Sequence, residues 1–188
     1  MTSAARADHD RRFTGRTPGA SEPFFNEMLP LLPRGLALDV GAATGRHSLA
    51  LARAGLKVVA IDHSAVALET LGRAARAERL CIWPIVAEFE DFPIPANKFD
   101  LVVNINFLDR TLTPALKRAL RPGGMLLFDT FLIDQATLGH PRNRDFMLAH
   151  YELRALLEGL TLLRYQEGLT VYPDGTQAWR AGALARRI

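Results

Sequence analysis

Short apolar runs alternate along this chain with segments in which apolar residues recur at helical spacing. An unbroken apolar run is typical of a strand buried in a parallel sheet. Such runs occur at 36–40, 57–61, 80–86, 99–105 and 125–129. Helical spacing is found between them, and Ser64 is suited to cap a helix that continues through Leu68 and Leu71 toward Arg79. This alternation predicts an α/β fold with a doubly wound sheet.

Two departures from regular alternation shape the expected sheet. Pro84 interrupts the third run, and because proline cannot donate to a strand ladder, this strand is expected at an edge. The segment EFEDFPIPANK at 88–98 is too short and too rich in proline for a full helix. One crossover helix, between the third and fourth strands, is therefore expected to be missing.

The C-terminal part predicts a long loop followed by an antiparallel hairpin. The polar stretch 132–150 should lie over the strand ends, and a helix is expected at 152–157. Apolar runs at 161–165 and 177–184 flank the sequence YPDG, which is typical of a hairpin turn. This hairpin should end the sheet.

The first twenty residues lack apolar periodicity and are expected to form a mobile arm, with residues 21–188 forming one domain. Within the arm, Arg11, Arg12 and Phe13 are candidates to close over a pocket. A disordered surface arm would explain the same composition.

A helix is expected after Ser21, which is a suitable N-cap with Pro23 in the first turn. Its apolar face is formed by Phe24, Phe25, Met28 and Leu29. This helix should pack beside the first strand.

The turn after the first run, GAATG at 41–45, is small enough for a ligand to approach main-chain N–H groups closely. The dinucleotide-binding pattern requires glycine where Ala43 and Arg46 stand. A phosphate-binding P-loop requires Lys before Ser or Thr, whereas Arg46 precedes His47. Neither motif fits this turn.

Acidic residues stand at the ends of three expected strands: Asp39, Asp62 and Glu88. Asp39 and the turn after it resemble the signature of class I S-adenosylmethionine-dependent methyltransferases, which is acid, any, Gly, any, Gly, any, Gly. Ala43 replaces the middle glycine, and the same turn is expected if its φ is negative. The resemblance implies a Rossmann-like sheet of order 3-2-1-4-5-7-6, mostly parallel with an antiparallel last strand.

The resemblance also implies S-adenosylmethionine as the cofactor. Asp39 would lie near the methionine ammonium, Asp62 would accept both ribose hydroxyls, and Glu88 would accept from the adenine amino group, whose ring His63 and Phe89 would flank. The remaining expected cofactor residues are Gly41, Ala42, Ala43, Gly45 and Asn104. Acceptor groups suit a ligand with a sulfonium, an ammonium and a ribose diol. Helix capping by Asp39 and Asp62 is the structural alternative.

The loop NFLDR at 106–110 lies at the carboxyl edge, where open α/β sheets bind ligands. Asn106, Arg110 and Arg142 are therefore candidates to orient an anionic substrate. This loop, the RPGG turn at 121–124 and the sequence GHPRN at 139–143 are similar to small bacterial methyltransferases of the tellurite-resistance type. The resemblance implies a small-molecule acceptor and in-line methyl transfer achieved by positioning.

No catalytic residue is assigned from the sequence. A soft nucleophile such as a thiol, selenium or tellurium compound needs no base, whereas a hydroxyl or ammonium acceptor needs one. Asp109, Asp129 and His140 are the candidate proton acceptors. A pairing of Asp109 with Arg110 and a turn-capping role for Asp129 are equally open.

Charge and composition limit the kinds of binding partner that are expected. The net charge of +3 is spread over short basic clusters, which argues against a nucleic-acid substrate. The single cysteine, Cys81, excludes an internal disulfide and is expected as a buried inert thiol. The histidines show no metal-ligand spacing, so no metal is expected. Without a long apolar run or secretory signal, we expect a cytoplasmic protein that does not bind membranes.

Other functions remain open at this point. A protein that binds the cofactor without catalysis, as a partner subunit, has the same motifs. A nucleic-acid or protein methyltransferase is less favoured, and NINF at 104–107 replaces the Asn-Pro-Pro-Tyr type motif of amino-methylating enzymes. A nicotinamide-linked oxidoreductase is not expected, because the spacing of the glycines does not match the dinucleotide-binding pattern. Both a monomer and a homodimer are compatible with the sequence.

Overall fold

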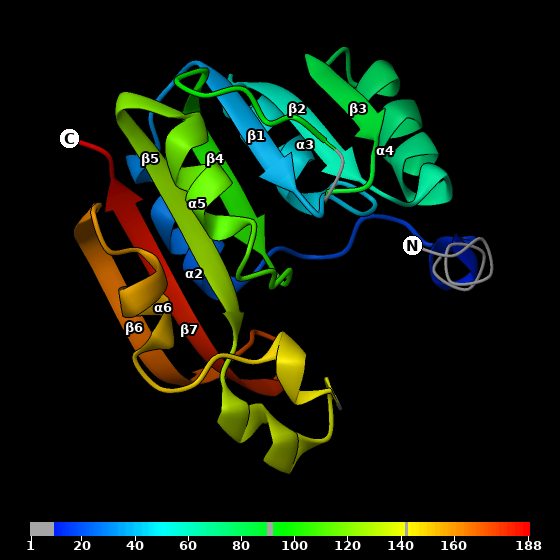
Figure 1. Ribbon diagram of the computed structural model, residues 1–188. Helices are drawn as coiled ribbons and strands as arrows, with labels where there is room; N and C mark the ends of the chain where they lie inside the picture. The colour runs from blue at the N-terminus through cyan, green and yellow to red at the C-terminus, as the bar shows by residue number, and fades with distance from the viewer. Residues whose placement is uncertain (1–9, 90–91, 142) are drawn as a thin grey trace.

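The computed structural model describes residues 10–89, 92–141 and 143–188 (Figure 1). A seven-stranded sheet has the order β3-β2-β1-β4-β5-β7-β6, as the resemblance implied. Neighbouring strands from β3 to β5 are parallel, whereas β7 is antiparallel to both β5 and β6. The strands are β1 Leu36–Val40, β2 Lys57–Asp62, β3 Ile82–Val86, β4 Phe99–Ile105, β5 Leu120–Phe131, β6 Thr161–Val171 and β7 Gln177–Arg186.

Helices cover both faces of the sheet, and each face has its own apolar core. In Figure 1, α5 and α6 lie in front of the sheet and α2, α3 and α4 lie behind it. The helices are α2 Pro23–Met28, α3 Arg46–Arg53, α4 Ala65–Ala77, α5 Thr113–Ala119 and α6 Glu152–Leu156, with short 3₁₀ turns η1 Leu29–Leu31, η2 Ile133–Leu138 and η3 Arg144–Phe146. Buried leucines of α5 and α6 form the front core, whereas those of α3 and α4 join Phe24 and Phe25 in the rear core.

Several local expectations are confirmed. The Ser64 hydroxyl accepts a hydrogen bond from the Ala67 N–H and caps α4. β3, which contains Pro84, lies at the edge of the sheet and pairs only with β2 among the described residues. The β6–β7 hairpin closes around the turn at 172–176, where the Tyr172 N–H donates to the Thr176 carbonyl.

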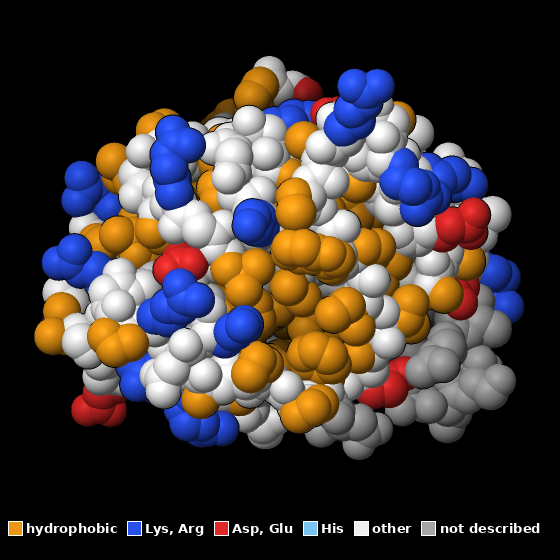
Figure 2. All heavy atoms as spheres, turned by 90° about the horizontal axis from the view of Figure 1, so that it is seen from above, with side chains coloured by type: hydrophobic (Ala, Val, Ile, Leu, Met, Phe, Trp, Pro, Cys, Tyr) orange, Lys and Arg blue, Asp and Glu red, His pale blue; other side chains and the backbone are white. Residues whose placement is uncertain are grey.

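The missing crossover helix leaves part of the front face thinly covered. The described residues between β3 and β4 contain no helix. Phe92 and Ile94 of this connection pack partly against the front core, and Trp83 of β3 stays 47% exposed. Figure 2, which views the molecule from above, shows hydrophobic side chains gathered around a hollow.

Three details differ from the sequence expectations. Glu22, not Ser21, is the N-cap residue of α2, and the Ser21 hydroxyl bonds Asn26 instead. The helix contacts β5, and a Cβ at Gly182 of β7 would lie 2.6 Å from the Phe24 ring, so α2 packs over the middle of the sheet rather than beside β1. Cys81 is exposed, since it precedes the edge strand instead of lying within it.

The fifth strand is also longer than expected. β5 begins at Leu120 and includes the RPGG segment, where the pairing register with β4 shifts. A bulge at the start of the strand absorbs these residues, whereas the sequence suggested a turn before it.

Residues 1–9 and Arg142 lie outside the described residues, and the mobile arm over residues 1–20 stays a prediction. No helix among the described residues combines the length and apolarity needed to cross a membrane.

Candidate functional site

The turn between β1 and α3 is held from the end of β2. The N–H groups of Gly41 and Ala42 donate to the Ile61 carbonyl, each at 3.0 Å. The Asp62 carboxylate accepts from the Ala43 N–H at 2.9 Å and from the Ser64 N–H at 2.8 Å. Ala43 has a φ of +47°, so the condition of a negative φ, under which the turn was expected to tolerate an alanine, is not met. The Asp62 contact stabilises this left-handed conformation at a residue that is not glycine.

Two glycines of the turn leave room for different neighbours. Gly41 has a φ of +70°, and a Cβ there would lie 3.0 Å from Cβ of Phe107. Gly45 has a φ of +90°, and a Cβ there would lie 2.2 Å from a methyl carbon of Leu71 on α4. Gly41 therefore lets the loop after β4 approach the turn, whereas Gly45 lets α3 pack on α4.

A cavity of about 250 Å³ opens at the carboxyl edge above this turn. Its lining combines the turn, the ends of β2 and β4, and one residue of the N-terminal segment: Phe13, Gly41, Ala42, Ala43, Arg46, His47, Asp62, His63, Phe89, Ile105, Asn106 and Phe107. A second cavity of about 570 Å³ shares three of these residues with the first, namely His63, Phe89 and Phe107. We call them the turn cavity and the outer cavity.

Aromatic rings form the boundary between the two cavities. The centroids of Phe89 and Phe107 are 4.5 Å apart, and the ring of His63 stands edge-on to Phe89 at 6.3 Å. The flat apolar surfaces are suited to a planar heterocycle, with the Asp62 carboxylate beside them.

A series of mostly buried polar side chains, which we call the polar chain, reaches the other wall of the turn cavity, which Arg46, His47 and Asn106 line. It consists of Glu22, Arg46, His47, Asn106, Asp129 and Arg180. Except for Arg46 and Asn106, its members are at most 4% exposed. Since buried charges are costly unless paired, the alternation of acid and base explains how this group is tolerated.

The environment shifts the pKa values of both acids of the polar chain, in opposite directions. Burial raises the pKa of Glu22, but the hydrogen bond and charge of His47 and the charge of Arg46 outweigh it and lower the pKa to about 2. Burial raises the pKa of Asp129 to about 6, against the opposing charge and hydrogen bond of Arg180.

Known proteins share both the sequence pattern and the architecture. Residues 37–124 match the family model described as a methyltransferase domain. The chain is 34% identical over 166 residues to ribosomal protein L11 methyltransferase of Chelativorans sp. (strain BNC1), covering 84% of this chain and 53% of that protein. It is also 34% identical over 103 residues to ubiquinone biosynthesis O-methyltransferase of Actinobacillus pleuropneumoniae serotype 5b (strain L20), covering 50% and 44%. The chain thus spans about half the length of these relatives.

Solved structures agree on the fold. TehB from Haemophilus influenzae superposes with a TM-score of 0.77 at 20% identity, over 97% of this chain and 67% of that one. Burkholderia thailandensis 1,6-didemethyltoxoflavin-N1-methyltransferase, solved with 1,6-didemethyltoxoflavin and S-adenosylhomocysteine, superposes with a TM-score of 0.72 at 19% identity, over 98% and 88%. The chain thus has the fold of class I S-adenosylmethionine-dependent methyltransferases, and residues 37–124 match a methyltransferase domain.

The residues of this site fit S-adenosylmethionine, the cofactor of class I methyltransferases. The Asp62 carboxylate at the end of β2 supplies acceptor oxygens and a negative charge. At the end of β4, the buried Oδ1 of Asn104 has no hydrogen-bond partner among the described residues, while its Nδ2 donates to the Phe107 carbonyl at 2.8 Å. An orphan acceptor and a carboxylate suit a ligand that is rich in donors and carries positive charge.

The expected cofactor residues are only partly brought together. Asp62, His63 and Phe89 line the turn cavity together with Gly41, Ala42 and Ala43 of the turn, whereas Glu88 lines the outer cavity. Asp39 and Asn104 are buried and do not line the turn cavity, nor does Gly45. Asp39 accepts from the Ser48 hydroxyl at 2.6 Å, and burial raises its pKa. A direct contact of Asp39 with the cofactor stays a prediction.

The expected substrate residues have structural partners. Arg110 lines the outer cavity, but its guanidinium binds Glu152 and the carbonyls of Asp145 and Met147, which ties the loop before α6 to the loop after β4. Arg110 therefore does not pair with Asp109, whose carboxylate accepts from the Thr111 and Leu112 N–H groups. The substrate roles of Asn106, Arg110 and Arg142 stay predictions.

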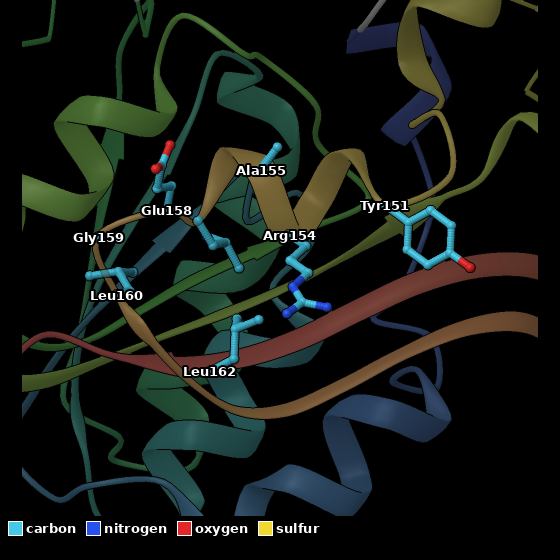
Figure 3. A pocket seen from close by; sticks show the side chains of 8 residues that line it. Tyr151, Arg154, Ala155, Glu158, Gly159, Leu160 and Leu162 are labelled. Atoms are coloured by element: carbon cyan, nitrogen blue, oxygen red, sulfur yellow. The ribbon is translucent and has the colours of Figure 1, made fainter.

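A further cavity of about 570 Å³ lies between α6 and β6 (Figure 3). Tyr151, Arg154, Glu158 and Leu162 are among its lining residues. None of the residues expected at the cofactor or the substrate lines this cavity. No group of three or more metal-ligating side chains occurs in the described part of the chain.

The sequence analysis missed Glu22 and Arg180 of the polar chain, and it missed the positions of Arg46, His47 and Phe107 on the cavity wall. Arg46 and His47 directly follow the glycine turn, so their position at the start of α3 was a usable signal. Glu22 gave no such signal, because its partners are distant in sequence.

Proposed function

We propose that this chain transfers the methyl group of S-adenosylmethionine to a small-molecule acceptor in the turn cavity. The proposal is carried by one juxtaposition: the Asp62 carboxylate and the aromatic wall of Phe89 and Phe107 face one cavity beside a glycine turn. When bound, the cofactor supplies a methyl group on an electron-poor sulfonium.

The side chains then act mainly by binding and orientation. Asp62 would hold the ribose, and His63 and Phe89 would hold the adenine. Phe13 from the N-terminal segment lines the same cavity and would exclude water from it. In-line transfer needs the nucleophile within reach and aligned, which such a fixed wall provides.

The candidate proton acceptors are poorly placed to act as bases. Asp129 is fully buried against Arg180, and Asp109 lines the outer cavity but its carboxylate accepts from the Thr111 and Leu112 N–H groups of the turn before α5. His140 lines neither the turn cavity nor the outer cavity. This supports an acceptor with a soft nucleophile, such as a thiol or a selenium or tellurium oxyanion, which needs no base.

Calorimetry tests the cofactor. We expect S-adenosylmethionine and S-adenosylhomocysteine to bind, and Asp62→Ala to weaken both at least tenfold, because a charged hydrogen bond is lost. Glu69→Gln, an exposed acid on α4, is the matched control and should change nothing. Tighter binding of NAD, or no binding of the first two ligands, would refute the proposal.

A labelled-methyl assay tests the acceptor class. Thiols, selenite, tellurite and catechols are compared with a ribosomal protein and tRNA, since relatives of this chain include a ribosomal protein L11 methyltransferase and a tRNA U34 carboxymethyltransferase. Transfer to a small soft nucleophile supports the proposal. Transfer only to a macromolecule or only to hydroxyls contradicts it, and cofactor binding without any transfer would favour a binding protein.

A further inference from the structure

The polar chain connects five parts of the fold that are distant in sequence. Glu22 stands before α2, Arg46 and His47 begin α3, Asn106 follows β4, Asp129 lies on β5 and Arg180 on β7. Glu22 Oε1 accepts from Arg46 at 2.7 Å and from Asn106 Nδ2 at 2.5 Å, while its Oε2 lies 2.5 Å from His47 Nε2. Asn106 is therefore the point at which the N-terminal half of this chain meets the C-terminal half.

Asn106 has a backbone that needs support. Its φ is +57°, in the left-handed region that asparagine tolerates better than most residues. Its N–H donates to the Asp129 carbonyl at 2.9 Å. The side chain lines the turn cavity, so the conformation of this residue shapes the cavity wall.

The amide of Asn106 is oriented by charge on both sides. Nδ2 donates to the carboxylate of Glu22, and Oδ1 accepts from Nη2 of Arg180 at 2.8 Å. A flipped amide would place oxygen against carboxylate and NH₂ against guanidinium, so only one orientation is stable. Two neutral hydrogen-bond partners would favour one orientation of the amide over the other less strongly.

Arg180 does not line the turn cavity, and its guanidinium is held by Asp129 and Phe131. Its Nε lies 3.1 and 3.2 Å from the two oxygens of Asp129, and its guanidinium sits 4.7 Å above the Phe131 ring. Arg180 is only 2% exposed, so the protein shields it from solvent. Among the described residues, the hydrogen bond to Asn106 is the direct contact of the Arg180 side chain with a residue that lines the turn cavity.

We propose that Arg180, fixed by Asp129, is a positioning residue that sets the orientation of the Asn106 amide on the cavity wall, and so aligns the acceptor for methyl transfer. This inference rests on the proposed function. It extends the site to β5 and β7, beyond the matched methyltransferase domain, which ends at residue 124.

The first test compares Arg180→Met with Arg53→Met, which removes an exposed arginine that pairs with Glu78. We expect Arg180→Met to lower kcat at least tenfold with the acceptor found above, while the affinity for S-adenosylhomocysteine changes less than threefold. Arg53→Met should leave both unchanged. An unchanged kcat in Arg180→Met would overturn the inference, and so would equal losses in kcat and cofactor affinity, which indicate a general structural role.

Arg180→Lys and a charge-swapped pair keep the test valid if Arg180→Met fails to fold. Lysine retains the charge but lacks the two-sided geometry of guanidinium, so it should not restore kcat. Asn106→Asp sets two carboxylates against each other and should lower kcat, whereas adding Glu22→Gln restores a donor and should recover at least part of it. Failure of that recovery, or full activity of Arg180→Lys, contradicts the inference.

The wild-type protein separates this inference from the proposed function. If it does not bind S-adenosylhomocysteine or transfers no methyl group, the proposed function fails and the inference falls with it. If it does both and only the variants behave otherwise than expected, the inference alone is wrong.

Discussion

The glycine turn and the polar chain are two walls of one cavity, but they are built on different physical principles. The turn is a contiguous segment whose shape depends on space, since Gly41 and Gly45 admit Phe107 and Leu71. The polar chain joins residues up to 84 positions apart and depends on charge pairing. The comparison teaches that the turn is encoded locally in the sequence, whereas the polar chain depends on segments that only the folded structure brings together.

The largest expected effect is on the turn. Gly45→Ala forces a side chain into the left-handed region and against Leu71, which should destabilise the protein by about 4 kcal/mol from strain and overpacking together. Urea unfolding measures this loss, and it should be the same at pH 4 and pH 7. Gly175→Ala has a similar φ of +82° but open space around it, so it should cost only about 1 kcal/mol. Equal losses in the two variants would contradict the packing argument.

The contribution of the polar chain to the free energy of unfolding should depend on pH, whereas that of the turn should not. The folded-state pKa of Glu22 is lowered from 4.5 to about 2, so its contribution is complete above pH 4.5 and is lost as the pH falls toward 2. Glu22→Gln should therefore reduce the free energy of unfolding by about 3 kcal/mol at pH 7, and by much less near pH 2. Unfolding curves of both proteins across this range provide the measurement. A gap that stays constant with pH would show that Glu22 is not stabilised as a carboxylate.

The contribution of Asp129 to stability should change with pH in the opposite direction to that of Glu22. Its folded-state pKa is raised from 3.8 to about 6, so the native state holds the proton more tightly and stability falls as the pH rises from 3.8 to 6. Because asparagine does not ionise, the stability of the wild type relative to Asp129→Asn should drop by about 2 to 3 kcal/mol between pH 4 and pH 7. Parallel stability curves for the two proteins would rule out this titration.

The sequence predicted the frame of the fold well, for physical reasons. Buried parallel strands are continuous apolar runs, so β1, β2 and β4 were found nearly to the residue. The Ser64 cap, the edge position of the Pro84 strand and the YPDG hairpin each rest on a strong local preference.

What failed depended on neighbours that are not local. The positive φ of Ala43 requires the Asp62 carboxylate, and the N-cap position of Glu22 places its side chain in the polar chain instead of on the helix. The pairing of Arg110 with Glu152, 42 residues away, was not expected either. Such pairs of residues, distant in sequence, can be identified only from the three-dimensional structure.

The sheet carries one tryptophan near each end of its strand order, and the missing crossover helix makes their exposures differ. Trp83 of β3 is nearly half exposed because no helix covers it, whereas Trp179 of β7 is partly buried and its backbone N–H donates to Oε1 of Gln135. These are the two tryptophans of the chain. An aqueous quencher such as iodide should therefore dim the fluorescence of the first more than that of the second, so the protein has a built-in optical reporter for each half of the sheet.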